Sequence, residues 1–426
     1  MKRREFLSTA ALTGGVLALP RALAGQSLQL TRPEGEPATI AADEGYWRRV
    51  AEQYRVTDKV VNLEAGYWGM MPIPVHEEYL RHVDRVNRES SFYARKSYPA
   101  DLAAVRVKVA AFLDVAAEEI AFTRSATESL QLLIAGYNGL KRGDAVLFAD
   151  LDYPAMQNAM KWLEERRGVR IVRITLPEPA SRDAVMSVYE AALNANPDVR
   201  LVLLTHLNNK TGLIIPVKAL AELARRHNAD VIVDAAHSIG QTTTKIPDLG
   251  CDFAGFNLHK WIGAPLGVAV MYVKKARLAA IDRMMADDEA PADSINSRVH
   301  TGTTNFAAFL TIPAALAFHE AVGPAHKAAR IRYLRDRWVS QVRSTAAIEV
   351  LTPDEPGMAA GITSFRVRGR TSRQETERII DALLTTHGIF TARRTGLDRG
   401  DCIRVTPALY TRVEDVDRFA RALLTI

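Results

Sequence analysis

From about residue 100 onward, short apolar runs alternate with longer stretches in which apolar residues recur at helical spacing. The runs have the length and composition of buried strands, and the stretches between them have the length of helices. The expected strands are IAFT (120–123), AVLFAD (145–150), VRIVRI (169–174), VRLVLLTHL (199–207) and VIVDAA (231–236). Buried strands that alternate with helices are typical of a mainly parallel sheet covered by helices on both faces. Ligands of such sheets bind beyond the carboxyl ends of the strands.

After about residue 311 the pattern changes. A long helical stretch rich in Ala, Arg and His runs to about residue 344, and short strands such as GITSFRVRG and CIRVTP then alternate with helices near 372–386 and 414–424. We therefore predict an α/β protein with a large domain (61–310) and a smaller C-terminal α+β domain (311–426). Residues 25–60 are expected to form an arm and a helix.

The first 24 residues predict an export signal. Arg3 and Arg4 precede a mildly apolar run that ends at Leu19, and Ala22-Leu23-Ala24 has the small residues of a cleavage site. The run is too short to span a membrane. This pattern matches a twin-arginine signal, although a basic, disordered start before a short helix is the alternative. We expect cleavage near Ala24 and a periplasmic protein that is exported folded, with any cofactor loaded beforehand.

Composition narrows the function classes. The chain has 426 residues, 48% hydrophobic and 24% charged, which is ordinary for a globular protein. Half of the net charge of +6 belongs to the predicted signal, and no basic stripe with aromatics points to nucleic acid. No spacing of Cys or His indicates a metal site. Cys251 and Cys402 lie in separate strand-like runs; a disulfide is conceivable in an oxidising compartment, but we predict two buried free thiols.

Two reactive side chains follow apolar runs in the middle of the chain. Asp234 ends the run VIV, and Lys260 follows FAGFNLH beside Trp261. An amine in such surroundings is partly desolvated, which lowers its pKa and favours Schiff-base chemistry. A buried carboxylate is costly unless it faces a cation, and a protonated pyridine nitrogen is such a cation.

The motifs VDAAHSIG, NLHKW and CIRVTPALYTRVEDVDR resemble the class V aminotransferases, fold-type I enzymes that depend on pyridoxal 5'-phosphate (PLP). The resemblance covers nearly all of the chain after residue ~60, and NLHKW is closest to the isopenicillin N epimerase-like branch. It implies that Lys260 forms the Schiff base with PLP and then moves protons. It also implies that Asp234 keeps the pyridine nitrogen protonated, so that the ring acts as an electron sink.

The resemblance assigns further cofactor contacts. Ala126 and Thr127 open a helix after a strand and match the family's phosphate cup, although Ser125-x-x-Glu128 is equally an ordinary capping box. Tyr153 is expected to stack on the pyridine ring. The alternative is that Tyr153 only forms a turn before Pro154.

Four more polar residues near the strand ends are candidates. Asn208 resembles the asparagine near the phenolic oxygen of PLP, with Asn209 as its rival by one position. His237 is expected near the same oxygen, although by itself it reads as a structural histidine. Asn257 and His259 share one side of their strand and are expected near the phosphate; for His259 a structural role is the alternative.

The resemblance also implies a partner subunit and a substrate site. Gly302-Thr303 matches a motif that contacts the phosphate of the partner subunit, which predicts a homodimer with sites at the interface. Arg404 matches the arginine that binds the substrate α-carboxylate, with Arg394 as a second candidate, because a guanidinium fork suits a carboxylate. The loop 66–68 is expected over the active site, with a plain turn as the alternative.

We therefore expect a PLP-dependent enzyme that acts at the α-carbon of an amino-acid-type substrate, by epimerisation or transamination. Epimerisation needs a second proton carrier, for which Tyr67, Tyr93 and His206 are candidates. Cysteine desulfurase activity is not expected, because the loop after Arg394-Thr395-Gly396 reads LDRGD and lacks a cysteine nucleophile. A tailoring enzyme for a peptide siderophore and a non-catalytic binding protein on the same fold are the alternatives. A nicotinamide dehydrogenase is disfavoured, because no GxGxxG follows an early strand.

Overall fold

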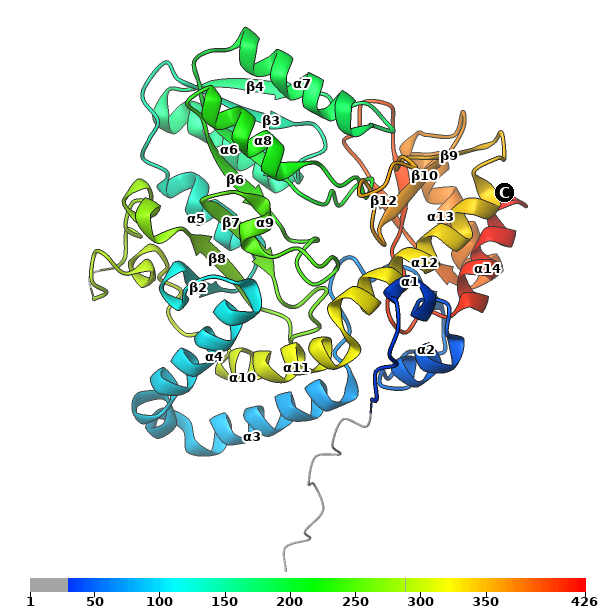
Figure 1. Cartoon of the computed structure of the whole chain (residues 1–426), viewed down its shortest axis with the longest axis horizontal. Helices are drawn as coiled ribbons and strands as arrows, with labels where there is room; N and C mark the ends of the chain where they lie inside the picture. The colour runs from blue at the N-terminus through cyan, green and yellow to red at the C-terminus, as the bar shows by residue number, and fades with distance from the viewer. Residues whose placement is uncertain (1–29, 288) are drawn as a thin grey trace, which may run out of the picture.

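The computed structural model describes residues 30–287 and 289–426, so the predicted export signal lies outside the described residues. Its larger part is built on a seven-stranded sheet with the strand order β2-β8-β7-β6-β5-β3-β4 (Figure 1). These strands are β2 (Ile120–Thr123), β3 (Ala145–Ala149), β4 (Arg170–Ile174), β5 (Val199–Thr205), β6 (Asp230–Asp234), β7 (Phe253–Asn257) and β8 (Ala269–Val273).

Five neighbouring strands of this sheet, from β7 to β4, run parallel. Strand β8 pairs antiparallel with β7, and β2 pairs antiparallel with β8, so β2 again points in the direction of β7. The carboxyl ends of β2, β3, β5, β6 and β7 therefore lie at one edge. The sequence pattern had not indicated β8, since its run AVMYV follows β7 after a loop rich in Gly and Pro.

Helices cover both faces of the sheet, as predicted. Along β3, Val146 and Phe148 pack in a core with residues of α5 (Ala126–Gly136) and α6 (Pro154–Arg167), whereas Leu147 and Ala149 belong to the core shared with α7 (Arg182–Ala195) and α8 (Val217–Arg226). Since neighbouring residues of a strand point to opposite faces, this alternation requires an apolar layer on each side. The short helix α9 (Ile246–Leu249) joins β6 to β7.

The C-terminal part contains a second, antiparallel sheet with the order β12-β13-β10-β9. Its strands are β9 (Ile348–Val350), β10 (Thr363–Val367), β12 (Ala392–Arg394) and β13 (Cys402–Val405). The helices α12 (Pro324–Val342), α13 (Arg373–His387) and α14 (Val413–Leu423) accompany this sheet (Figure 1). Its core contains Trp338, Phe365 and Phe419, whose rings meet edge to face.

The N-terminal segment is tied to this C-terminal part. Helices α1 (Pro37–Ile40) and α2 (Glu44–Ala51) lie beside α12, and Arg330 of α12 donates to Glu44. Strand β1 (Val61–Asn62) then pairs in parallel with β11 (Ile389–Phe390). This pairing, between segments far apart in the sequence, carries the following loop toward the edge of the large sheet.

The remaining helices are α3 (Ile73–Lys96), α4 (Tyr98–Leu113), α10 (Phe306–Leu310) and α11 (Ile312–Val322). The helical stretch predicted after residue 311 is interrupted, because Gly323 adopts a φ of +88° and Pro324 follows it. Within the described residues, we find no single helix of sufficient length and apolarity to cross a membrane. The stretches Phe306–Val322 and Pro324–Val342 meet that criterion only as a pair, with a bend of 72° between them.

Candidate active site

A cavity of about 410 Å³ lies where the carboxyl ends of the strands meet. It collects residues from the loop after β1, from the start of α5, from the ends of β3, β5, β6 and β7, and from β12 and β13. Most of the predicted site residues line it, namely Ala126, Thr127, Tyr153, Asp234, His237, Asn257, His259, Lys260, Arg394 and Arg404. The fold therefore brings together side chains that are spread over almost 280 positions of the sequence, as a parallel sheet does with groups at its strand ends.

Lys260 lies in the loop between β7 and β8. Its Nζ is 3.0 Å from Nε2 of His237. Burial, together with the nearby cations Arg404 and Arg394, lowers the pKa of Lys260 to about 8, against the opposing effects of Asp234 and Glu64. A substantial fraction of this amine is therefore free near neutral pH, as a nucleophile or a proton acceptor requires.

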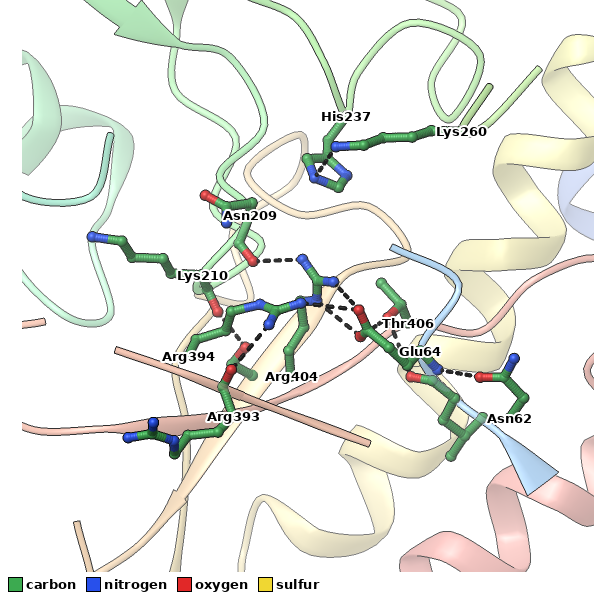
Figure 2. A network of polar contacts seen from close by, with 12 residues as sticks. Asn62, Glu64, Asn209, Lys210, His237, Lys260, Arg393, Arg394, Arg404 and Thr406 are labelled. Atoms are coloured by element: carbon green, nitrogen blue, oxygen red, sulfur yellow. Dashed lines mark hydrogen bonds and ion pairs between the residues drawn. The ribbon is translucent and has the colours of Figure 1, made fainter. Parts of the chain in front are cut away.

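The ring of His237 is held in one tautomer. The indole N–H of Trp261 donates to Nδ1 of His237 over 3.3 Å, so Nδ1 carries the lone pair and the neutral ring has its proton on Nε2. Burial holds the pKa of His237 well below its usual value, and the Lys260 charge adds to this effect. Nε2–H is therefore a donor toward the uncharged form of the Lys260 amine (Figure 2).

Asp234, the last residue of β6, is 4% exposed and lines the cavity. One carboxylate oxygen accepts the N–H of Ala236 at 2.9 Å. Burial raises the pKa of Asp234, and this hydrogen bond and the Lys260 charge lower it in part. A cation beside the carboxylate would complete its stabilisation, as expected for the protonated nitrogen of a pyridine ring.

The start of α5 combines a helix cap with a donor for an anion. Oγ of Ser125 accepts the N–H of Glu128 at 3.1 Å, and Oδ1 of Asn257 accepts the N–H of Ala126 at 2.8 Å. The N–H of Thr127 lies in the first turn, where the helix itself offers no acceptor. Ser125 is thus the N-cap of α5, while the Glu128 carboxylate accepts the N–H of Arg124 and does not close a capping box. The capped helix start lines the cavity, and its contact with a phosphate stays a prediction.

Asn257 and His259 lie on the same side of the cavity. Asn257 positions the start of α5 through the hydrogen bond to Ala126. Burial lowers the pKa of His259 to about 4, and its Nδ1 donates to the carbonyl of Val268 at 3.0 Å. The neutral ring presents Nε2 as an acceptor, so direct contact with a phosphate oxygen requires a second proton, which an adjacent anion favours.

The structure distinguishes Asn208 from Asn209. The amide of Asn208 donates to the carbonyl of Leu151 and accepts the N–H groups of Lys210 and Thr211, so it holds the turn and does not line the cavity. Asn209 does line the cavity, and its Oδ1 is buried without a hydrogen-bond partner among the described residues. Asn209, the rival position, is therefore the asparagine that is available for the predicted cofactor contact.

Thr303 and Tyr153 are both exposed. Thr303 lies outside the cavity of its own chain, and its predicted contact with a partner subunit stays a prediction. Tyr153 is the residue at the N-terminus of α6, directly before Pro154, and its side chain makes no capping hydrogen bond. This position agrees with the alternative of a turn tyrosine, but Tyr153 also lines the cavity. Of the candidate second proton carriers, Tyr67 lines the cavity. Tyr93 and His206 do not: Tyr93 donates to Asp101, and His206 is buried beside β5.

The predicted carboxylate-binding arginine has an internal partner. Nε of Arg404 donates to Oε2 of Glu64 at 3.2 Å, and its Nη2 donates to Oε1. Arg394 also reaches Oε1 at 2.9 Å (Figure 2). Glu64 was not singled out from the sequence, where the signal was only an acidic residue before a glycine-rich loop. That loop reaches the site as predicted, since Gly66 and Tyr67 line the cavity.

This set of residues fits PLP. A buried carboxylate lines the cavity at the end of β6, an amine that is partly uncharged lines the same cavity, and a helix start offers an N–H for a phosphate. Asp234 would hold the ring nitrogen, Thr127 the phosphate and Lys260 the aldehyde carbon. The unpartnered Oδ1 of Asn209 offers a further polar contact within the same cavity.

Comparison with known proteins gives consistent results. Residues 74–419 match the family model described as aminotransferase class V. Isopenicillin N epimerase of Amycolatopsis lactamdurans is 27% identical over 400 residues, which cover 88% of this chain and 98% of that protein. A probable cysteine desulfurase of Halalkalibacterium halodurans is 27% identical over 338 residues, which cover 75% of this chain and 80% of that protein.

Two solved structures share the fold. The apo structure of a cysteine desulfurase from Thermococcus onnurineus superposes with a TM-score of 0.77 and 21% identity, over 88% of this chain and 96% of the other. A mutant of C-DES with glycine covalently linked to its PLP cofactor gives a TM-score of 0.76 and 20% identity, over 87% and 98% of the two chains. These likenesses agree with the α/β fold predicted from the sequence.

Proposed function

The chain belongs to the class V aminotransferase family and its cofactor is pyridoxal 5'-phosphate, and from this premise we propose that it acts at the α-carbon of an amine substrate of amino-acid type, with Lys260 as the proton carrier. When bound, PLP supplies an electron sink for the negative charge left at the α-carbon. The observation that carries the proposal is the buried Lys260 amine, whose pKa of about 8 lets it take up and return a proton near neutral pH.

The other cavity residues orient and tune this centre. Asp234 stabilises positive charge on the ring nitrogen, and the start of α5 binds the phosphate. Trp261 fixes the tautomer of His237, so Nε2–H would be available as a hydrogen-bond donor to an oxygen of the bound cofactor. Burial of these groups keeps bulk water from the amine and strengthens their electrostatic interactions.

Within this chemistry we propose epimerisation, with Tyr67 as the second proton carrier. Removal of the α-proton by Lys260, followed by delivery of another proton to the opposite face by a second group, inverts the α-carbon. Among the three candidates from the sequence, Tyr67 is the one that lines the cavity. The similarity to isopenicillin N epimerase along nearly its whole length supports this choice. Transamination, which needs Lys260 alone, is the second candidate, supported by the same amine.

A comparison of wild type with Lys260→Ala and Tyr67→Phe tests both candidates. Wild-type protein with PLP is expected to show a visible absorption band that Lys260→Ala lacks. With a panel of L- and D-amino acids and their amides in D₂O, wild type should incorporate deuterium and invert configuration. Tyr67→Phe should still incorporate deuterium but invert at least about 100-fold more slowly. Conversion of the band to the pyridoxamine form without inversion would instead support transamination, and no band in wild type would refute the assignment.

Desulfurase chemistry is disfavoured by the position of the thiols. That reaction class needs a cysteine that can reach the substrate sulfur as a thiolate. Cys402 lies in β13, is 1% exposed, and burial raises its pKa to about 12. Cys251 is also buried, and its pKa is likewise raised to about 12. Neither cysteine lines the cavity.

We also propose that the protein is exported by the twin-arginine route and forms a homodimer. The export proposal rests on Arg3, Arg4 and the small residues before Ala24. Replacement of both arginines by lysine should abolish periplasmic accumulation, and a periplasmic level equal to wild type would contradict this. The dimer proposal rests on the exposed Thr303, which matches a motif that reaches the partner's site. Light scattering at micromolar concentration tests it, and a monomer mass would contradict it.

A further inference from the structure

Lys327 is a buried lysine that lies directly behind the turn carrying Lys260. It belongs to α12, in the C-terminal part of the chain, and is 6% exposed. Its Nζ donates to the carbonyl of Trp261 and lies 3.4 Å from Nδ1 of His319. A small cavity of about 40 Å³ has Lys260, Trp261 and Lys327 in its walls. Because an amine is costly to bury away from water, this position calls for an explanation.

The turn 258–264 depends on Lys327 for one of its backbone groups. Within the turn, the carbonyl of Lys260 accepts the N–H of Gly263 at 3.2 Å. The carbonyl of the next residue, Trp261, instead receives its hydrogen bond from the Lys327 side chain. A buried carbonyl that loses its donor is costly, so removal of the Lys327 amine would favour a rearranged turn.

Trp261 passes this constraint on to the catalytic centre. Its side chain is held at the other end, because the indole N–H donates to Nδ1 of His237 over 3.3 Å. Nε2 of the same ring is 3.0 Å from Nζ of Lys260, as Figure 2 shows. The carbonyl and the indole belong to one residue, so a change of the Trp261 backbone moves the group that fixes the His237 tautomer.

The hydrogen bond from Lys327 does not require a charge. Burial alone lowers the pKa of Lys327 to about 7, and both the charged and the uncharged amine keep an N–H for the Trp261 carbonyl. His319 is neutral, since burial holds its pKa well below its usual value, and the Lys327 charge adds to this effect. The contact between α12 and the turn therefore persists across neutral pH.

We propose that Lys327 is a positioning residue of the active site, which holds the Trp261 turn from α12 and thereby keeps His237 in the tautomer that faces the Lys260 amine. The inference rests on the proposed function, in which Lys260 carries the proton. It adds a residue that lies outside the cavity of the site and acts on Lys260 through two intervening side chains.

The test compares PLP-loaded, full-length wild type with Lys327→Met, which keeps the apolar stem but removes the donor. With the amino acid whose α-proton wild type exchanges fastest in D₂O, the rate at saturation should fall at least about 10-fold, while KM should change less than about 3-fold. Nitrogen-15 spectra of the histidine rings, with His237 assigned by His237→Gln, give a second readout. Wild type should carry the His237 proton on Nε2, and Lys327→Met should show both tautomers.

Lys245→Met is the matched control. Lys245 also donates from a partly buried amine to a backbone carbonyl, that of Phe112, and its charge also acts on His319, but it lies outside the small cavity. This variant should keep the wild-type exchange rate and the His237 tautomer. Trp338, buried in the same helix as Lys327, serves as the internal reference for the fold, through the hydrogen exchange of its indole N–H.

Three outcomes would overturn the inference. The first is a wild-type His237 with its proton on Nδ1, which decides the matter whether or not Lys327→Met folds. The second is a folded Lys327→Met with an unchanged rate and an unchanged tautomer. The third is a parallel loss of protection at Trp338, because Lys327 would then only stabilise α12. Wild type that exchanges no amino acid would refute the proposed function, whereas the His237 tautomer would still decide the role of Lys327.

Discussion

Lys260 should titrate far below a solvated lysine, and this prediction tests the physical basis of the site directly. Burial lowers its pKa from 10.5 to about 8. At about pH 7, roughly 10% of such an amine is uncharged, against roughly 0.03% of an amine with a pKa of 10.5. The cavity therefore increases the concentration of free amine by about 300-fold.

Competitive labelling of the amines in cofactor-free protein measures this quantity. Acetic anhydride at limiting concentration modifies free amines only, and mass spectrometry reports the extent at each lysine as a function of pH. Labelling of Lys260 should rise with pH and reach half its maximum near pH 8, because the reactive form is the unprotonated one. Lys275, with a side chain 71% exposed, is the internal reference in the same sample.

A second arm tests the sign of the neighbouring charges. Asp234 raises the pKa of Lys260, so Asp234→Asn should move the labelling midpoint to lower pH. Arg404→Leu should move it to higher pH, because Arg404 lowers the pKa of the amine. Circular dichroism of each variant excludes loss of the fold as the cause. The reasoning would be refuted if the labelling midpoints of Lys260 and Lys275 coincided, or if the midpoint of Lys260 moved to higher pH in Asp234→Asn.

Other residues give independent predictions. Cys402→Ser should keep the deuterium exchange of wild type. Native Cys402 should resist alkylation at about pH 8, because burial raises the pKa of its thiol to about 12. Rapid alkylation of Cys402 would contradict this prediction. Ser125→Ala removes the hydroxyl that accepts the N–H of Glu128 and should lower the free energy of unfolding by about 1 kcal/mol. It should also weaken PLP binding in a spectral titration. Unchanged PLP affinity would show that this cap does not support the phosphate site. Arg366→Leu should cost about 3–5 kcal/mol in denaturant unfolding, because Glu178, 3% exposed, is left buried without its cation, and a second change, Glu178→Leu, should recover most of the loss.

Much of the fold and the centre of the site follow from local sequence. The fully buried β3 reads as a continuous apolar run, as does most of β5, and Ser125, Ser372 and Gly388 mark helix ends by their own preferences. Asp234 and Lys260 stand out because an ionisable group that ends an apolar run has no other ready explanation. Such signals lie within a few residues of the feature that they predict.

Other features depend on contacts between distant segments. Whether Asn208 or Asn209 faces the cavity depends on how the turn folds back on Leu151, and one position changes which side chain is available. The run AVMYV became an antiparallel strand because β7 and β2 accept it as a neighbour between them. Neither choice is encoded in the spacing of apolar residues alone.

The sequence by itself determined the alternation of strands and helices, the family, and the lysine and aspartate at the centre of the site. Only the tertiary structure decided that the arginine predicted to hold a carboxylate already holds one. Arg404 and Glu64 are separated by 340 positions, and each looks ordinary in its own segment. The physical reason is that an ion pair belongs to two segments at once, so it exists only after the residues that follow β1 and β13 have been brought side by side by the bridge between Glu64 and Thr406.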